Sequence, residues 1–438
     1  MQWTKNQRVI LTNSTLWSSY DYLTTAFLPV FILAIGANNV WVGLFSSIPY
    51  FAMMLAQIPG AFSIQLLPRK VIYLATTGVS RLFWIGVVIS PALYGAKSIY
   101  YAALFYFVCK LLEYLADSAW TTMLADVVPT AIRGTFIGHR MVLMGLAGTV
   151  AYLIGGYLLD LFPKGDLWGF YIVFLVGMGI GLLSTLSYTR FDEPTKHEHE
   201  HYHMKEFFTM KGDFAKFNLF IFWFYFAYMI VGPFFTVYML KNLGISNTFF
   251  VVTTGVSTIA RLLSQQYIGR LSDKVGDKMI MMFVCVATAI VPFTFYFITP
   301  ANLWLLIPVH IFSGVAWAGF DIAILNLLLD FSDGKKQPVR IAEMQMVTSL
   351  AIVISPIVGG YLADHAIFAM GAIPFLFLLG SGMRLASVFF LLPIPEPRVK
   401  AHKTPTDVFR DNVGAHPIEG AIHVTRNIHK RLKAFMLP

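Results

Sequence analysis

Residues 110–126 read Lys-Leu-Leu-Glu-Tyr-Leu-Ala-Asp-Ser-Ala-Trp-Thr-Thr-Met-Leu-Ala-Asp and close an apolar run that starts near Ile99. Three charged residues, Lys110, Glu113 and Asp117, therefore lie where a membrane helix should carry none. Their spacing of three and four places them on one helical face. Because unpaired charge is costly in hydrocarbon, this face must look into a protein interior or a wet cavity. The stretch predicts a transport site.

The same stretch has a counterpart later in the chain. Asp117 recurs as Asp321, Asp126 as Asp330, and Gly-Gly-Tyr-Leu-Leu-Asp at 155–160 as Gly-Gly-Tyr-Leu-Ala-Asp at 359–364. Each pair is separated by the same 204 positions (321−117, 330−126 and 359−155). A constant offset of this kind indicates that the chain consists of two copies of one unit.

The composition is that of a polytopic membrane protein. Of the 438 residues, 57% are hydrophobic and only 13% are charged, against about 25% in an average soluble domain. A formal charge of +9 does not indicate nucleic-acid binding here, because no basic stripe is interleaved with exposed aromatic residues. Cys109 and Cys285 fall in apolar runs of different halves, which argues against a disulfide framework.

Apolar stretches of about 20 residues, the length that spans a bilayer, predict an all-α membrane protein with twelve transmembrane helices. Six lie in each half, in two pseudo-symmetric bundles that run the same way through the membrane. We expect them near 14–36, 40–66, 71–94, 99–125, 136–161, 168–189, 217–240, 247–268, 279–298, 302–329, 342–364 and 369–393.

The polar segments set the domain organisation and the orientation. We expect an N-terminal bundle (1–190), a His-rich linker (191–216), a C-terminal bundle (217–395) and a tail (396–438), with no removed signal peptide. Lys and Arg gather on one side, so both termini should be cytoplasmic in a multi-pass protein of the plasma membrane. Alternating histidines at 197–203 can bind a metal or simply be solvated, and the tail can be an amphipathic helix or disordered.

The segment Gly-Arg-Leu-Ser-Asp-Lys-Val-Gly-Asp-Lys, residues 269–278, closely resembles the cytoplasmic loop signature of the major facilitator superfamily. The resemblance implies two six-helix bundles over roughly residues 10–395, which rock about a central site in alternating access. In this loop Gly269 and Gly276 allow close approach, and Asp273 is a fixed anion. We predict that Asp273 holds the start of the fifth helix, near Arg133 and Arg140, when the transporter is closed to the cytoplasm.

The chain departs from that family's patterns in several places. Asp277 stands where the family usually has a basic residue, and Ile64 occupies the place of the acid in the first-half loop. Lys110 and Glu113 resemble part of a second signature that usually begins with Arg. Tyr152 replaces the proline of a kink typical of drug and proton antiporters, which lowers the expectation of drug efflux.

In such a fold, the first, fourth, seventh and tenth helices line the cavity. Beyond the face of Lys110, Glu113 and Asp117, the candidate residues of the substrate and proton pathway are Asp21, Arg81, His310, Trp317, Asp321 and Arg384. Aromatic residues of the seventh helix can line the cavity or face lipid, and Gly232-Pro233 can bend that helix.

Asp117 and Asp321 are the candidate proton sites with matching positions. Each lies nine residues before the last acid of its helix, about 13 Å above it at 1.5 Å per residue. Either acid can take up protons, or each can form a static pair with a base such as Arg81, Arg261 or Arg384. Arg81, Lys110 and Arg384 can equally anchor an anionic substrate.

The sequence favours a secondary active transporter that moves a small solute by alternating access, coupled to protons or another ion. The alternatives are an exporter of drugs or lipids, and a non-transporting receptor or scaffold. No nucleotide loop, nucleophile signature or metal-spaced set is found in the helices, so we expect no enzyme, cofactor or resident metal. We expect a monomer in the lipid bilayer, without nucleic-acid partners.

Overall fold

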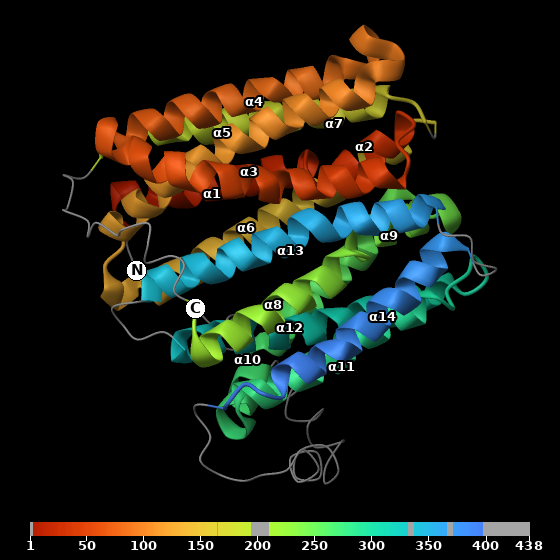
Figure 1. The fold of residues 1–438 in the computed structure, drawn as a ribbon. Coiled ribbons are helices and arrows are strands. Elements are labelled where there is room, and N and C mark those ends of the chain that lie inside the picture. Colours follow the sequence, from red (N-terminus) through yellow and green to blue (C-terminus); the bar gives the residue numbers. More distant parts are fainter. Residues whose placement is uncertain (1–2, 164, 194–209, 332–336, 366–370, 397–438) are drawn as a thin grey trace, which may run out of the picture.

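The structure is a computed structural model that describes residues 3–163, 165–193, 210–331, 337–365 and 371–396. The linker histidines, a possible metal site, and the tail, a possible amphipathic helix, lie outside these residues. The described chain is almost entirely helical, and the helices form two bundles that lie side by side (Figure 1). This confirms the predicted all-α fold with two bundles.

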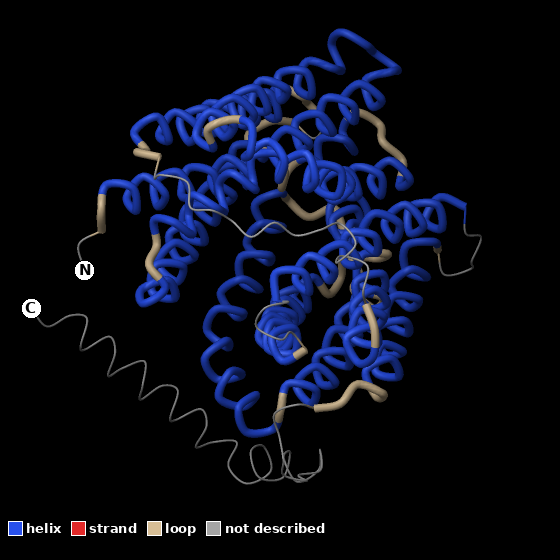
Figure 2. The backbone as a smooth tube through the Cα atoms, turned by 60° about the vertical axis from the view of Figure 1, so that its left-hand side comes forward, coloured by secondary structure: helices blue, strands red, loops and turns tan. Residues whose placement is uncertain are grey.

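The helices follow the apolar runs closely. The first bundle contains α1 (Lys5–Leu23), α2 (Leu28–Ala34), α3 (Asn39–Leu66), α4 (Arg69–Tyr94), α5 (Ser98–Val127), α6 (Thr130–Asp160) and α7 (Trp168–Ser187). The second contains α8 (Gly212–Met229), α9 (Gly232–Val237), α10 (Asn247–Val275), α11 (Asp277–Phe295), α12 (Leu306–Asp330), α13 (Gln337–His365) and α14 (Ala372–Leu391). Within the described ranges, loops form only short connections and breaks (Figure 2).

Two of the rods are broken, and the breaks are equivalent. Helices α1 and α2 together make one rod, and α8, α9 and the π-helical turn Tyr238–Asn242 make another. Pro29 and Pro233, again 204 positions apart, are each the second residue of the second piece, because a proline ring cannot continue the ladder of the preceding turn. Across the interface, α2 packs against α9.

Counted as rods, the described helices number twelve, which is consistent with the prediction. Nine stretches of the described chain are long and apolar enough to cross a membrane, and one of them, Arg69–Val127, contains both α4 and α5. The broken α1–α2 rod and the polar helix α10 are outside these nine. Large apolar side chains such as Leu146, Leu263 and Phe389 are exposed, as expected for a chain in contact with lipid.

The two ends of the molecule differ in how the bundles meet. We call the end where α1 and α8 begin the linker end, and the opposite end, where α2 and α9 lie, the distal end (Figure 1). At the distal end one hydrophobic core is continuous through both bundles, and includes Phe31 of the first and Phe234 of the second. At the linker end each bundle has a separate core. The bundles are therefore joined at the distal end.

Each bundle also fixes its linker end in the same way. Lys70 donates from Nζ to the carbonyls of Thr189 and Phe191, while Glu193 accepts from the first amides of α4. Lys278 likewise donates to the carbonyls of residues 392 and 394, and Glu396 accepts from its amide. These bonds satisfy helix-end groups that would otherwise lack partners.

Candidate functional site

The charged face of α5 forms the centre of a buried ion-pair network. Glu113 accepts hydrogen bonds from Arg81 Nη1 of α4 at 2.9 Å, from Lys110 Nζ at 2.9 Å and from Trp17 Nε1 of α1 at 2.8 Å. The spacing of three residues brings Lys110 onto the same side of the helix as Glu113. Because three donors surround it, Glu113 is a fixed anion that holds α1, α4 and α5 together.

The network continues to α1 through a weaker contact. Lys110 Nζ lies 3.4 Å from Asp21 Oδ1, the longest ion pair of the network. The side chains of Arg81, Lys110 and Glu113 are buried, whereas that of Asp21 is 29% exposed. Asp21 is thus the member of the network that a solute can reach most easily.

Asp117 lies one helical turn beyond Glu113, but the surroundings of its carboxylate are different. Its carboxylate makes no ion pair or hydrogen bond with any other described residue, and its side chain is exposed to the cavity. The backbone carbonyl of Asp117 accepts from Thr121 Oγ1, as in an ordinary helix. This carboxylate is consequently free to bind a proton or a cation.

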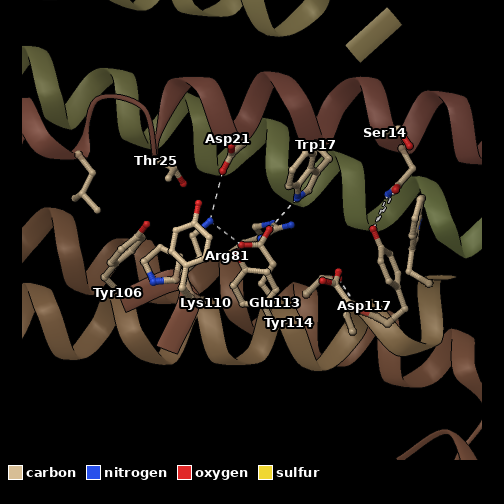
Figure 3. Close-up of a pocket in the computed structure, with 18 of the residues that line it drawn as sticks. Ser14, Trp17, Asp21, Thr25, Arg81, Tyr106, Lys110, Glu113, Tyr114 and Asp117 are labelled. Carbon is tan, nitrogen blue, oxygen red and sulfur yellow. Dashed lines mark hydrogen bonds and ion pairs between the residues drawn. The ribbon is translucent and has the colours of Figure 1, made fainter. Parts of the chain in front are cut away.

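A cavity of about 480 Å³ opens beside these groups. Its lining belongs entirely to the first bundle, and Figure 3 shows Trp17 and Asp21 on one helix opposite Glu113 and Asp117 on another. The lining residues that sequence reasoning missed include several aromatic or hydroxylated side chains: Ser14, Trp17, Tyr50, Tyr106, Tyr114 and Trp120. Trp17 and Trp120 lie at helical spacing from Asp21 and Asp117, which is the signal that could have identified them.

In the second bundle, the acid that matches Asp117 is Asp321, and it forms an ion pair. Asp321 of α12 accepts from Arg261 Nε at 2.6 Å and from Arg261 Nη2 at 2.5 Å. The two side chains are 29% and 44% exposed. Of the alternatives left open by the sequence, Asp321 therefore shows the static pair, and Asp117 does not.

Three other predicted residues lie within the packing of the second bundle. His310 Nδ1 lies 2.7 Å from the Leu306 carbonyl, and Trp317 packs edge-on against Tyr228. Arg384 is buried, and its guanidinium donates to the carbonyls of Ala227, Tyr228 and Thr288. None of the three lines the 480 Å³ cavity.

The position of Arg384 explains how the break between α8 and α9 is tolerated. Ala227 and Tyr228 belong to the last turn of α8, whose carbonyls lose their helical partners where the rod breaks. A cation at a helix C-terminus also interacts favourably with the helix dipole. Arg384 thus caps α8. At the equivalent break after α1, Thr24 is the C-cap residue: its amide donates to the Tyr20 and Asp21 carbonyls, and its Oγ1 also donates to the Tyr20 carbonyl at 2.7 Å.

In this structure the predicted gate acid, Asp273, forms no ion pair with Arg133 or Arg140. Asp273 is exposed and has no ion pair within the described ranges, while Arg140 donates to Ser14 and lies 4.5 Å over the Trp120 ring. Arg133 donates to the Val128 carbonyl at 3.5 Å. Gly276 has φ of +91° in the turn between α10 and α11, a conformation that favours glycine. At Gly269 an added Cβ would meet only Ile322, at 3.8 Å.

No cluster of three or more His, Cys, Asp or Glu side chains arranged for a metal ion is present in the part of the chain that the structure describes. The acids of the cavity are instead dispersed. Asp21 lies on α1, and Glu113 and Asp117 lie one turn apart on α5.

Comparison with known proteins identifies the family. The profile of the Major Facilitator Superfamily matches residues 10–222 and 217–432, one match for each bundle. No curated relative matches the chain in sequence. Among solved structures, the chain is similar to the nucleoside transporter NupG (16% identity, TM-score 0.71, covering 89% of this chain and 99% of that one).

Two further solved structures are similar. One is a bacterial homologue of the iron transporter ferroportin in an inward-facing state (13% identity, TM-score 0.72, covering 90% and 99% of the two chains). The other is a D-xylose-proton symporter (12% identity, TM-score 0.70, covering 90% and 98%). At these identities the likeness concerns the fold, and the profile matches establish the family: this chain belongs to the Major Facilitator Superfamily.

Proposed function

We propose that this protein is a secondary active transporter that moves a small solute by alternating access and couples the movement to protons at Asp117. The observation that carries the proposal is the unpaired Asp117 carboxylate on the wall of the cavity. An ionised carboxylate without a counter-charge is costly at membrane depth, so this group favours a bound proton or cation. A site that must bind and release a proton in every cycle needs such freedom.

The other acids of the pathway are better suited to holding helices together than to binding and releasing a proton. Glu113 is neutralised by Arg81 and Lys110. Asp321 is held by two guanidinium nitrogens of Arg261, Nε and Nη2. We therefore assign Glu113 and Asp321 to structure and Asp117 to proton binding.

The solute site in this proposal lies between Asp21 and Asp117. Trp17, Tyr50 and Tyr114 supply aromatic faces, and Lys110 supplies a cation whose contact with Asp21 is long. A solute that binds here can compete for Asp21 or Lys110, so binding changes the network between α1 and α5. That change gives a route by which solute and proton binding influence one another.

The linker end is the cytoplasmic side in this proposal. Arg69, Lys70, Lys274 and Lys278 lie at that end, and basic residues are enriched in cytoplasmic loops. The structure is then closed to the outside and apart at the cytoplasmic end, with both termini cytoplasmic. We propose the plasma membrane as its location and a monomer as the working unit.

An infrared measurement tests the proton site without knowledge of the solute. Titration of the protein in lipid should show a protonated-carboxyl carbonyl band that is absent in Asp117→Asn. Asp213→Asn is the matched control, because Asp213 is an exposed acid paired with Lys216, and it should leave the band unchanged. A band that persists in Asp117→Asn would assign the proton to another group.

A flux experiment tests transport itself. Because a ligand stabilises the folded state that binds it, a thermal-shift screen can first identify a solute. Uptake into proteoliposomes should then rise with an imposed pH gradient, and Asp117→Asn should remove that dependence. Uptake that changes with neither the pH gradient nor the substitution would contradict proton coupling. Solute binding without flux would favour the receptor alternative.

The exporter alternative receives less support. The rings of α8 pack within the second bundle, where Phe224 stacks on Phe320 and Tyr228 contacts Trp317. They do not form the wall of the cavity. A panel of lipophilic cations in the same thermal-shift screen would detect this class.

A further inference from the structure

The repeated segment Gly-Gly-Tyr-Leu-x-Asp has no role in the cavity, yet its acids make cross-bundle contacts. Asp160 ends α6 of the first bundle and accepts from the amides of Asn247 and Thr248 and from both their side chains, at 2.6–2.9 Å. Asn247 and Thr248 are the first residues of α10 in the second bundle. One carboxylate therefore ties the end of one helix to the start of another.

The second copy does the same in the opposite direction. Asp364, near the end of α13, accepts from the amides of Asn39 and Val40 and from the Asn39 side chain, at 2.8–3.2 Å. Asn39 and Val40 begin α3 of the first bundle. The two contacts are related by the internal repeat, and both lie at the distal end.

The capping geometry shows what each acid supplies. Asn38 and Ser246 precede α3 and α10 and cap the third amide of each helix in the usual way. The first two amides of each helix are satisfied by the carboxylate of the other bundle. An acid at the end of its own helix is electrostatically disfavoured, and the start of a foreign helix compensates for this.

The second glycine of the motif explains how each acid comes close enough to cap a helix of the other bundle. An added Cβ at Gly360, one turn before Asp364, would lie 2.5 Å from the Asn39 carbonyl oxygen. At Gly156, one turn before Asp160, it would lie 3.3 Å from the Asn247 carbonyl oxygen. Each glycine lets its helix approach the helix that the acid caps.

We infer that Asp160 and Asp364 form a paired distal latch, which holds the two bundles together and sets the balance between the two states of the transporter. Opening the distal end must transfer four helix-start amides from carboxylates to water. The latch acts on the equilibrium between conformations, so it can be tested separately from solute identity and proton coupling.

Spin labels on both ends of the full-length protein in lipid nanodiscs test the latch. Lys97→Cys and Ala301→Cys place labels on exposed distal positions of the two bundles, and Arg190→Cys and Lys274→Cys do so at the linker end. The native Cys109 and Cys285 are buried. Pulsed electron paramagnetic resonance then reports the distance distribution at each end.

Each Asp→Ala change should raise the distal open-to-closed ratio about fivefold, the factor given by the ~1 kcal/mol typical of a lost helix cap. The double variant should raise it about 25-fold if the two sites are independent, while distances at the linker end shorten. Asn variants should lie between wild type and Ala, because an amide keeps one accepting oxygen.

Asp166→Ala is the matched control, since Asp166 caps Trp168 within its own bundle, and it should leave both distributions unchanged. Unchanged distributions in a folded double variant would overturn the inference. Longer distances between the distal labels without shorter distances at the linker end would also overturn the inference. That result would mean that the distal helix ends fray locally while the bundles keep their relative position.

Discussion

The two bundles share a backbone plan but place charge differently. In the first, Arg81, Lys110, Glu113 and Asp21 form a network through three helices beside a cavity. In the second, the acid that matches Asp117 forms a partly exposed pair, Asp321 with Arg261, and Arg384 is buried against carbonyl oxygens. The repeat thus preserves rods, breaks and distal caps, while the chemistry of the interior has diverged.

This difference indicates which parts of a repeated unit are under geometric constraint. Helix breaks at Pro29 and Pro233 and caps by Asp160 and Asp364 depend on backbone positions that both copies must supply. A buried charge needs only local compensation, which can come from a carboxylate, as at Arg81, or from carbonyls, as at Arg384. This divergence is compatible with our proposal that solute and proton binding lie in the first bundle.

The largest expected difference concerns the central acid. Glu113→Gln leaves Arg81 and Lys110 buried without their main counter-charge, so we expect a loss of about 3–5 kcal/mol in unfolding free energy. Asp321→Asn in the second bundle should cost less than about 1 kcal/mol, because that pair is partly exposed. Thermal or denaturant unfolding in matched detergent measures both. Equal losses of unfolding free energy would mean that the network of the first bundle contributes no more to stability than the Arg261–Asp321 pair.

A smaller effect is expected at the two helix breaks. Arg384→Met removes a charged donor from the end of α8 and should cost about 1.5–3 kcal/mol, the range for hydrogen bonds to charged groups. Thr24→Val removes one neutral hydrogen bond from the end of α1 and should cost about 1 kcal/mol. Hydrogen exchange should also speed up at residues 226–233 in the first variant only. If exchange there is unchanged, Arg384 does not stabilise the break.

The smallest expected effect is a coupling energy. A double-mutant cycle of Arg261→Ala and Asp321→Ala should give less than about 1 kcal/mol, since both side chains reach solvent. The same cycle on Arg81 and Glu113 should give a larger value because both are buried. Stability of the four single and two double variants supplies both cycles. A larger coupling in the second bundle would reverse the comparison.

Most of the fold could be predicted from local pattern. The expected stretches 40–66 and 168–189 correspond to α3 at Asn39–Leu66 and α7 at Trp168–Ser187. Polar helices were harder to delimit, and α10 continues to Val275 where the apolar run suggested 268. Hydropathy identifies the part of a helix that faces lipid or core, and it loses the polar turns beyond the membrane.

The candidate site could be predicted in part. The shared face of Lys110, Glu113 and Asp117 follows from helical spacing, and the cavity lies beside it. The partners do not follow from spacing: Glu113 pairs with Arg81 and Asp117 has no partner among the described residues. The repeat marked Asp160 and Asp364 as equivalent, but their capping of the opposite bundle was missed. An acid at a helix C-terminus was the available signal.

What the sequence determined alone is the number of rods, the internal repeat and the face on which each charge lies, because periodicity is a property of neighbouring residues on one helix. Tertiary structure alone decided which charges meet: Arg384 turns to carbonyls, Asp273 stays exposed, and Asp160 caps a helix 87 residues away. Those outcomes depend on the distance and rotation between packed helices, which no single helix encodes.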